Sequence, residues 1–337
     1  MKKHKICKIL LVILAIFLCV AFYELLGICV AYKKQPEVSN TTKKETKNGS
    51  WNECSENTER AVIIEKNPEA LLQRVRLIKN AKKEIILSTF AFQSDESGKL
   101  ILGALHDAAD RGVHIRLLVD GMESWIDMEG NPYFYGLSSH ENVEIKLYNK
   151  ANPLKPWKMM GRMHDKYLIA DGKTYILGGR NTYNYFLGDF PGHKNYDRDV
   201  LVVCNEPEKE NSVNQLLDYF ETIWDQEDSG YFHNNKKLAN RKSVKNAVLE
   251  LQNGYQKYFE ENKERICDTD YTDETFETEK IALVSNPIHT GSKEPVVWYQ
   301  LGELMKNAKN RVKIHTPYII RSEEHTSELP VTVPYLV

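Results

Sequence analysis

Residues 161–181 (GRMHDKYLIADGKTYILGGRN) bring together side chains that suit chemistry on a phosphate group. The pattern H-x-K-x4-D-x6-G-G-x-N is formed by His164, Lys166, Asp171, Gly178, Gly179 and Asn181. Cleavage of a phosphodiester needs a nucleophile, donors that stabilise negative charge on oxygen, and a proton for the leaving alcohol. Histidine suits the first and third roles because its pKa lies near neutrality. Lysine and asparagine suit the second as hydrogen-bond donors.

The spacing of these residues predicts a β-hairpin that presents them together. Because His164 and Lys166 are two residues apart, their side chains leave the same face of a strand and can approach one phosphate. The pair Asp171-Gly172 favours a tight turn, which returns residues 174–177 as the second strand. Asn181 then comes back to the end of the hairpin where His164 lies. The glycines before it are predicted to let the backbone approach a ligand closely.

The elements around this hairpin predict an α/β fold. Apolar residues at helical spacing predict a helix over 67–82, followed by a strand over 84–92, a helix over 100–112 and a strand over 113–119. Further apolar runs predict strands at 143–148, 166–170, 174–178 and 200–204, and a helix over 212–224. Nearly continuous apolar strands that alternate with helices indicate an α/β sandwich, a mixed sheet with helices on both faces.

The N-terminus predicts a membrane anchor over residues 1–33. Lysines precede an apolar run from Ile9 to Tyr32 that only Glu24 interrupts, and such a run can span a bilayer. A cleaved signal peptide has a shorter apolar core and a small-residue exit site, so we favour a retained single-pass helix in a bacterial cell membrane. Lysines on both sides of the run nearly balance, which leaves the side of the catalytic domain open.

The rest of the chain divides by composition. Residues 34–59 are polar and without apolar periodicity, which indicates a flexible tether before a globular domain at 60–225. Residues 226–280 are polar and charged and contain one amphipathic helix within 243–266. This composition indicates a connector outside the core.

A repeat predicts a second domain. The sequence Lys-Asn-Ala-Lys at 79–82 recurs 227 residues later at 306–309, in both copies after an amphipathic helix and before an apolar run. Residues 281–320 would begin this domain, with a strand over 312–318, and the partner of His164 would lie near position 391, beyond the chain. Residues 321–337 include a stretch (RSEEHTSEL) that resembles a translated sequencing-adapter oligonucleotide, and we expect this tail to be non-native.

On its motif the chain resembles the phospholipase D superfamily, and within it the branch of the bacterial cardiolipin synthases. The resemblance covers about residues 60–225 and the start of a second domain at 281–320. It implies that His164 either forms a phosphohistidine or protonates the leaving group, while Lys166 and Asn181 hold the phosphate. It implies for Asp171 a structural and electrostatic role within the motif, and it makes Asp199 a candidate to orient a histidine, with capping of a turn as the alternative.

The resemblance implies a phosphatidyltransferase that needs no metal and no cofactor. A phospholipase D or a nuclease-type phosphodiesterase is the alternative, and a third is a catalytically inactive fragment on the membrane. The net charge of −2 and the pI near 6.6 argue against a specific nucleic-acid partner. The expected partners are a phospholipid substrate and the bilayer. The second motif is expected in cis, with a homodimer as the alternative, so the chain alone should have little activity.

Overall fold

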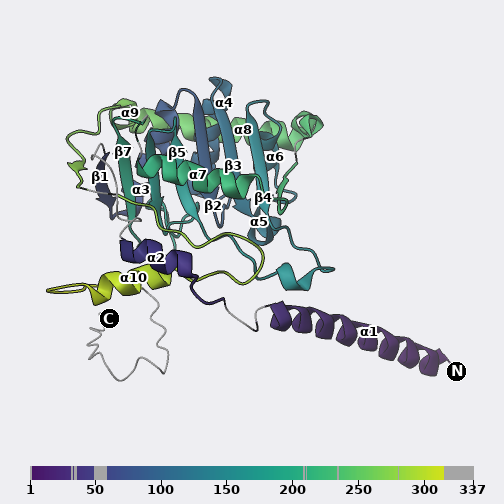
Figure 1. Ribbon diagram of the computed structural model, residues 1–337. Helices are drawn as coiled ribbons and strands as arrows, with labels where there is room; N and C mark the ends of the chain where they lie inside the picture. The colour runs from purple at the N-terminus through teal and green to yellow at the C-terminus, as the bar shows by residue number, and fades with distance from the viewer. Residues whose placement is uncertain are drawn as a thin grey trace. The chain divides into compact units, whose positions relative to one another are not determined.

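The computed structural model describes residues 2–31, 33, 36–48, 59–207, 209, 211–233, 235–279 and 281–314 (Figure 1). The chain separates into two compact units, residues 1–296 and 297–337. The predicted non-native tail at 321–337 lies outside the described residues.

The N-terminal segment is helical. Helix α1 (Lys2–Ala31) contains a stretch, Lys5–Ala31, that is long and apolar enough to cross a membrane. In the predicted flexible tether the structure places a second helix, α2 (Asn40–Asn48). Its start is favoured because the Ser39 hydroxyl accepts a hydrogen bond from the Thr42 amide at 3.1 Å.

A mixed sheet forms the centre of the first unit. Its order is β8-β4-β3-β2-β5-β6-β7-β1-β9. Strands β2, β3 and β4 are parallel, and the other neighbours pair antiparallel. The strands are β1 (Glu59–Ile64), β2 (Glu84–Thr89), β3 (His114–Asp120), β4 (Val143–Tyr148), β5 (Lys166–Ala170), β6 (Thr174–Gly178), β7 (Asp199–Cys204), β8 (Ser229–Tyr231) and β9 (Phe276–Glu277).

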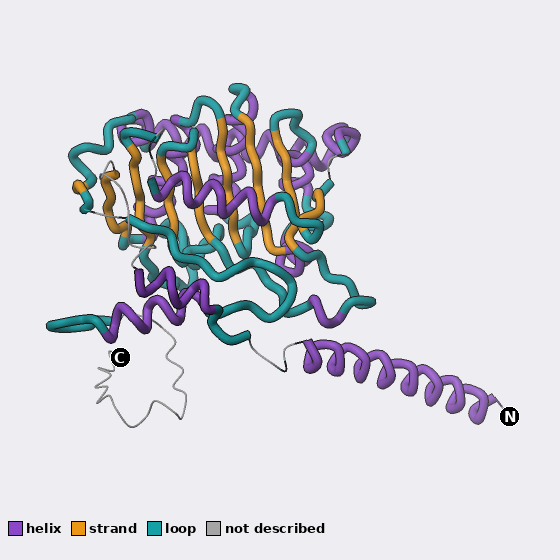
Figure 2. The backbone as a smooth tube through the Cα atoms, in the orientation of Figure 1, coloured by secondary structure: helices purple, strands orange, loops and turns teal. Residues whose placement is uncertain are grey.

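Helices cover both faces of this sheet, as Figures 1 and 2 show. One face packs against α3 (Asn67–Asn80), α4 (Glu96–Asp110), α6 (Pro132–Ser138), α8 (Lys242–Glu261) and α9 (Lys263–Cys267). The other face packs against α7 (Ser212–Trp224). Two apolar cores result, one on each side, because central strands such as β2 bury residues on both faces. The predicted α/β sandwich is therefore confirmed.

The shorter helices lie in the loops. They are α5 (Gly121–Asp127), η2 (Pro156–Lys158) and η3 (Lys236–Asn240). Helix α10 (Val296–Lys306) begins at the boundary between the two units and is the amphipathic helix predicted before the second Lys-Asn-Ala-Lys sequence. The strand predicted at 312–318 is not formed over residues 312–314, and residues 315–318 lie outside the described part.

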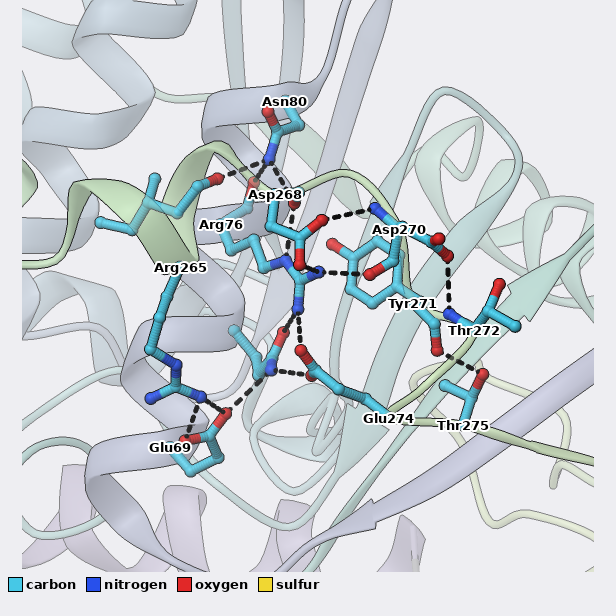
Figure 3. A network of polar contacts seen from close by, with 12 residues as sticks. Glu69, Arg76, Asn80, Arg265, Asp268, Asp270, Tyr271, Thr272, Glu274 and Thr275 are labelled. Atoms are coloured by element: carbon cyan, nitrogen blue, oxygen red, sulfur yellow. Dashed lines mark hydrogen bonds and ion pairs between the residues drawn. The ribbon is translucent and has the colours of Figure 1, made fainter.

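The prediction that residues 226–280 lie outside the core is wrong. Helix α8 buries an apolar stripe in the main core, and this stripe consists of Val244, Ala247, Leu251, Tyr255 and Phe259. The chain after α9 is then held to α3 by the buried Arg76, as Figure 3 shows. Arg76 donates to the Asp268 carbonyl and pairs with Glu274, each at 2.8 Å. The polar composition of the segment belongs to the solvent side of an amphipathic helix, not to a loose connector.

Candidate active site

The predicted hairpin is formed by β5 and β6, and it lies in the middle of the sheet between β2 and β7. Asp171 and Gly172 have φ of 53° and 61° at its turn, so the expected tight turn is confirmed. Lys166 pairs with Thr89 of β2, and Gly178 pairs with Asp199 of β7. The residues that flank the open end of the hairpin therefore meet where the strands end, beyond the carboxyl ends of β2 and β3. This end of the strands is called the His164 edge below; it is not an edge strand of the sheet.

At this edge His164 and Lys166 share one aromatic neighbour, Phe90. The His164 ring lies 4.5 Å from the Phe90 ring, and Lys166 Nζ lies 5.4 Å from the same ring centroid. Lys166 Nζ also donates a hydrogen bond to the His164 carbonyl at 2.7 Å. His164 is exposed, whereas Lys166 is only 6% exposed. The imidazole is thus accessible to a substrate, with an ammonium group behind it.

The environment lowers the pKa of both groups. Burial lowers the pKa of His164, and the positive charges of Lys166 and Arg162 lower it further against the opposing effect of Asp120. Burial lowers the pKa of Lys166 to about 8, although Asp165 and Asp197 favour its charged form. At pH 7 the imidazole is therefore mainly neutral, as a nucleophile requires, while the lysine is mainly charged.

Two carboxylates that the sequence did not single out fix the irregular segment that carries His164, just before β5 begins at Lys166. Asp120, buried at the end of β3, accepts hydrogen bonds from the Met163 amide at 3.0 Å and from Arg162 Nε at 2.9 Å. Asp165 accepts a hydrogen bond from the Tyr219 hydroxyl at 2.8 Å, and burial raises its pKa. These contacts hold the residues on each side of His164. A carboxylate at the end of a parallel strand is the signal that would have marked Asp120.

Asn181 lies at the same edge, as predicted. It is buried, and its side-chain oxygen accepts a hydrogen bond from the Ala91 amide at 3.2 Å. Its side chain also contacts the Tyr183 hydroxyl. With the oxygen held by backbone, the amide nitrogen is the end of the side chain that can donate to a ligand.

Asp171 does not belong to this site, which corrects its place in the predicted catalytic set. It lies at the turn, at the opposite end of β5 from His164. Its carboxylate accepts hydrogen bonds from the amides of Lys82, Lys83 and Glu84 at 2.7 to 3.2 Å. Asp171 therefore ties the hairpin to the start of β2, a structural role that agrees with the one implied by the resemblance.

The glycine pair and Asp199 also have different surroundings from those predicted. A Cβ at Gly178 would overlap Asp199 Oδ1, and one at Gly179 would overlap the Asp197 carboxylate. The missing side chains therefore make room for two carboxylates of the chain itself. The Asp199 carboxylate pairs with Arg74 at 2.9 Å and Arg180 at 3.2 Å, all three side chains being buried. Among the described residues, the Asp199 carboxylate forms no hydrogen bond with a histidine, in contrast to the expected orienting role.

Metal ligands were not expected in this chain. The described residues contain no group of three or more His, Cys, Asp or Glu side chains that could hold a metal ion. Of the site residues predicted from the sequence, the edge brings together one exposed imidazole, His164, one buried ammonium, Lys166, and one carboxamide, Asn181.

Comparison with known proteins agrees with this arrangement. Residues 74–224 match the family described as "Cardiolipin synthase, PLD-like domain". Cardiolipin synthase C of Escherichia coli K12 is 30% identical over 154 residues, which are 42% of this chain and 31% of that protein. An uncharacterised protein of Helicobacter pylori J99 is 30% identical over 212 residues, 58% of this chain and 39% of that protein. The chain thus spans less than two fifths of the length of either relative.

Among solved structures, the phospholipase D family member Nuc from Salmonella typhimurium is similar. It is 19% identical in sequence, the alignment covers 52% of this chain and 98% of Nuc, and the TM-score is 0.37.

Proposed function

Because the chain belongs to the phospholipase D superfamily and carries a domain of the cardiolipin synthase type, we propose that it is a membrane-bound phosphatidyltransferase that acts through a phosphohistidine at His164. The observation that supports this most directly is the exposed His164 ring beside the buried Lys166 ammonium on one aromatic residue, Phe90. A neutral nucleophile and a fixed cation at one phosphate are what phosphodiester transfer requires.

The proposed reaction has two steps. In the first, an imidazole nitrogen of His164 attacks the phosphorus of a phospholipid, and the headgroup alcohol leaves with a proton from a general acid. In the second, the hydroxyl group of an acceptor lipid attacks the phosphohistidine, gives up its proton, and releases neutral His164. Lys166 and Asn181 donate to the phosphoryl oxygens in both steps. The general acid would be the histidine of a second motif, in cis or in a second copy of the chain.

A substrate with a good leaving group tests this proposal without the second motif. p-Nitrophenolate leaves as a stable anion, so a p-nitrophenyl phosphodiester requires only the nucleophile and the phosphate-binding groups. We expect a burst of p-nitrophenolate, close to stoichiometric with protein, together with an acid-labile phosphoryl group on His164 detected by mass spectrometry. His164→Ala should abolish both signals.

His193→Ala is the matched control, because His193 is also exposed and contacts only Asn195 and Tyr185 among the described side chains. Its burst should equal that of the unchanged chain. A burst that survives His164→Ala, or a phosphoryl group on another residue, would refute the proposal.

The acceptor decides between transfer and hydrolysis. With vesicles that contain phosphatidylglycerol, transfer yields diphosphatidylglycerol and glycerol, whereas hydrolysis yields phosphatidic acid. We propose transfer in the bacterial cell membrane, with α1 as the anchor, and product analysis by mass spectrometry separates the two outcomes.

A further inference from the structure

Five large apolar side chains are exposed close to the edge of the sheet that carries His164. They form what we name the apolar rim, which consists of Trp125, Ile126, Leu154, Trp157 and Met160. Each of these residues is between 44% and 76% exposed. Single exposed apolar side chains are ordinary, but a group of five that includes two tryptophans indicates a surface that meets another apolar phase.

The rim lies on two neighbouring segments. Helix α5 follows β3, and the loop 149–163 with η2 follows β4 and leads directly into His164. Met122 of α5 and several residues of this loop line the same hollow of about 200 Å³. Because β3 and β4 are parallel neighbours, both segments leave the sheet at the edge where His164 lies.

Polar contacts give the rim a defined shape. Arg162 pairs with Asp120 at 2.7 Å and with Glu123 at 3.3 Å, which joins the loop to α5. The side-chain amide of Asn149 donates to the carbonyls of Lys158 and Gly161 at 2.7 and 2.8 Å. The apolar side chains of the loop therefore project from a segment that hydrogen bonds hold in place, and those of α5 project from a helix joined to it.

Outside the membrane-spanning candidate α1, exposed apolar side chains elsewhere in residues 59–296 are not grouped in this way. Between residues 59 and 296 the others that the structure describes lie on five separate strands, helices or loops: Ile63, Tyr185, Tyr196, Tyr231, Leu249 and Phe276. The concentration beside His164 is thus specific to that edge.

The charge of the loop favours an anionic partner. Residues 149–163 contain Lys150, Lys155, Lys158 and Arg162 and no acidic residue. Lys158 pairs with Asp228, but Lys150 and Lys155 form no ion pair with any carboxylate in the described chain. Tryptophan and lysine side chains together are typical of segments that lie in the headgroup region of anionic membranes.

The bilayer is also the constant neighbour of this domain. Between Ala31, which ends α1, and Glu59, which begins β1, the chain has 27 residues, 32–58. Fully extended, such a segment reaches at most roughly 100 Å. If α1 spans the membrane, the domain cannot leave its surface, so even weak contacts of the rim are made at a high effective concentration.

From these observations we propose that the apolar rim is a docking surface for a bilayer of anionic phospholipids, which brings the His164 edge against its substrate. The inference rests on the proposed function, because it explains how a lipid phosphate reaches His164. Trp125 and Trp157 insert between the headgroups, while Lys150 and Lys155 contact lipid phosphates.

Tryptophan fluorescence of the full chain in vesicles tests this docking. The vesicles contain phosphatidylglycerol and phosphatidylcholine, and the phosphatidylcholine is brominated so that its acyl chains quench nearby tryptophans. We expect the quenched signal of the unchanged chain to be largely lost in the double variant Trp125→Phe/Trp157→Phe. Trp224→Phe, which removes a buried tryptophan at the end of α7, should leave the quenched signal unchanged.

A gain of signal provides the matched control. In the double variant, Leu154→Trp should restore quenching by brominated lipid, whereas Leu249→Trp should not. Leu249 is also exposed, but it lies on α8, away from the His164 edge.

Acrylamide, a quencher dissolved in water, distinguishes the outcomes that would overturn the proposal. If acrylamide but not brominated lipid quenches Trp125 and Trp157, the rim faces water. If neither quenches them, protein covers the rim, either a second copy of the chain or residues beyond 296. Because the readout is fluorescence, it stands whether or not the phosphohistidine assay succeeds.

Discussion

The buried ammonium of Lys166 leads to a specific pH dependence. Its pKa is lowered to about 8, first because the group is buried. A phosphate is held by the charged form alone, so raising the pH above 8 should weaken the capture of substrate. His164 acts in its neutral form, and burial together with the charges of Lys166 and Arg162 lowers its pKa from the ordinary value. The second-order rate constant should therefore be highest at a pH where His164 is neutral and Lys166 is still charged.

The size of the effect follows from the protonated fraction of Lys166. With a pKa of about 8, this fraction falls from about 0.9 at pH 7 to about 0.1 at pH 9, whereas an ordinary lysine remains above about 0.9. The pH profile of kcat/KM reports the pKa values of groups in the free enzyme. We therefore expect this second-order rate constant to fall about tenfold between pH 7 and pH 9, in step with the charged fraction of Lys166.

The assay is the p-nitrophenolate burst measured at low substrate concentration from pH 5 to pH 10. In Lys166→Arg the remaining rate should stay level to pH 10, because a guanidinium does not lose its proton there. In Phe90→Ala the basic limb should move to higher pH, because water would reach the ammonium. A rate constant of the unchanged chain that is constant from pH 7 to pH 10 would show that Lys166 is not the group that holds the phosphate.

Three further predictions concern stability. Lys166→Met should raise the free energy of unfolding at pH 7 by about 1–3 kcal/mol in urea titrations, and this gain should fade between pH 8 and 10.5, where the unfolded chain still binds the proton that the folded chain has released. Asp171→Asn should lower it by about 1–3 kcal/mol because the amides of residues 82–84 lose a charged acceptor, and an altered burst rate per folded molecule would contradict the structural role. Gly178→Ala should cost about 3 kcal/mol or more by displacing Asp199, and a melting temperature equal to that of the unchanged chain would refute this.

Much of the site could be predicted because its determinants are local in sequence. Strands β5 and β6 are short apolar runs on either side of Asp171-Gly172, and this pair favours one kind of turn. Once the hairpin is assigned, the period of two predicts that His164 and Lys166 lie together. Both side chains do lie beside Phe90, although His164 precedes the strand, which begins at Lys166. The same logic also places Asp171 five residues from Lys166, roughly 16 Å along a strand, so its separation from the site was implicit in the pattern.

Other features depend on pairing between distant segments and leave no local pattern. Strands β8 and β9 have three and two residues, too few to show a periodicity. Phe90 is one apolar residue in an apolar run, and only the register between β2 and β5 brings it to Lys166. The apolar stripe of α8 was visible at helical spacing, but the polarity of its surroundings obscured its place in the core.

The two ends of the hairpin have opposite effects on the free energy of unfolding: the Lys166 end lowers it and the Asp171 end raises it. Burying the Lys166 ammonium costs up to about 3 kcal/mol, the difference between a pKa of 10.5 and about 8. At the other end of β5, Asp171 accepts hydrogen bonds from three backbone amides, which contribute a similar amount. The free-energy cost of burying Lys166 is thus offset by the hydrogen bonds of Asp171 on the same strand. Asp171 can therefore support the function of the motif without touching the substrate.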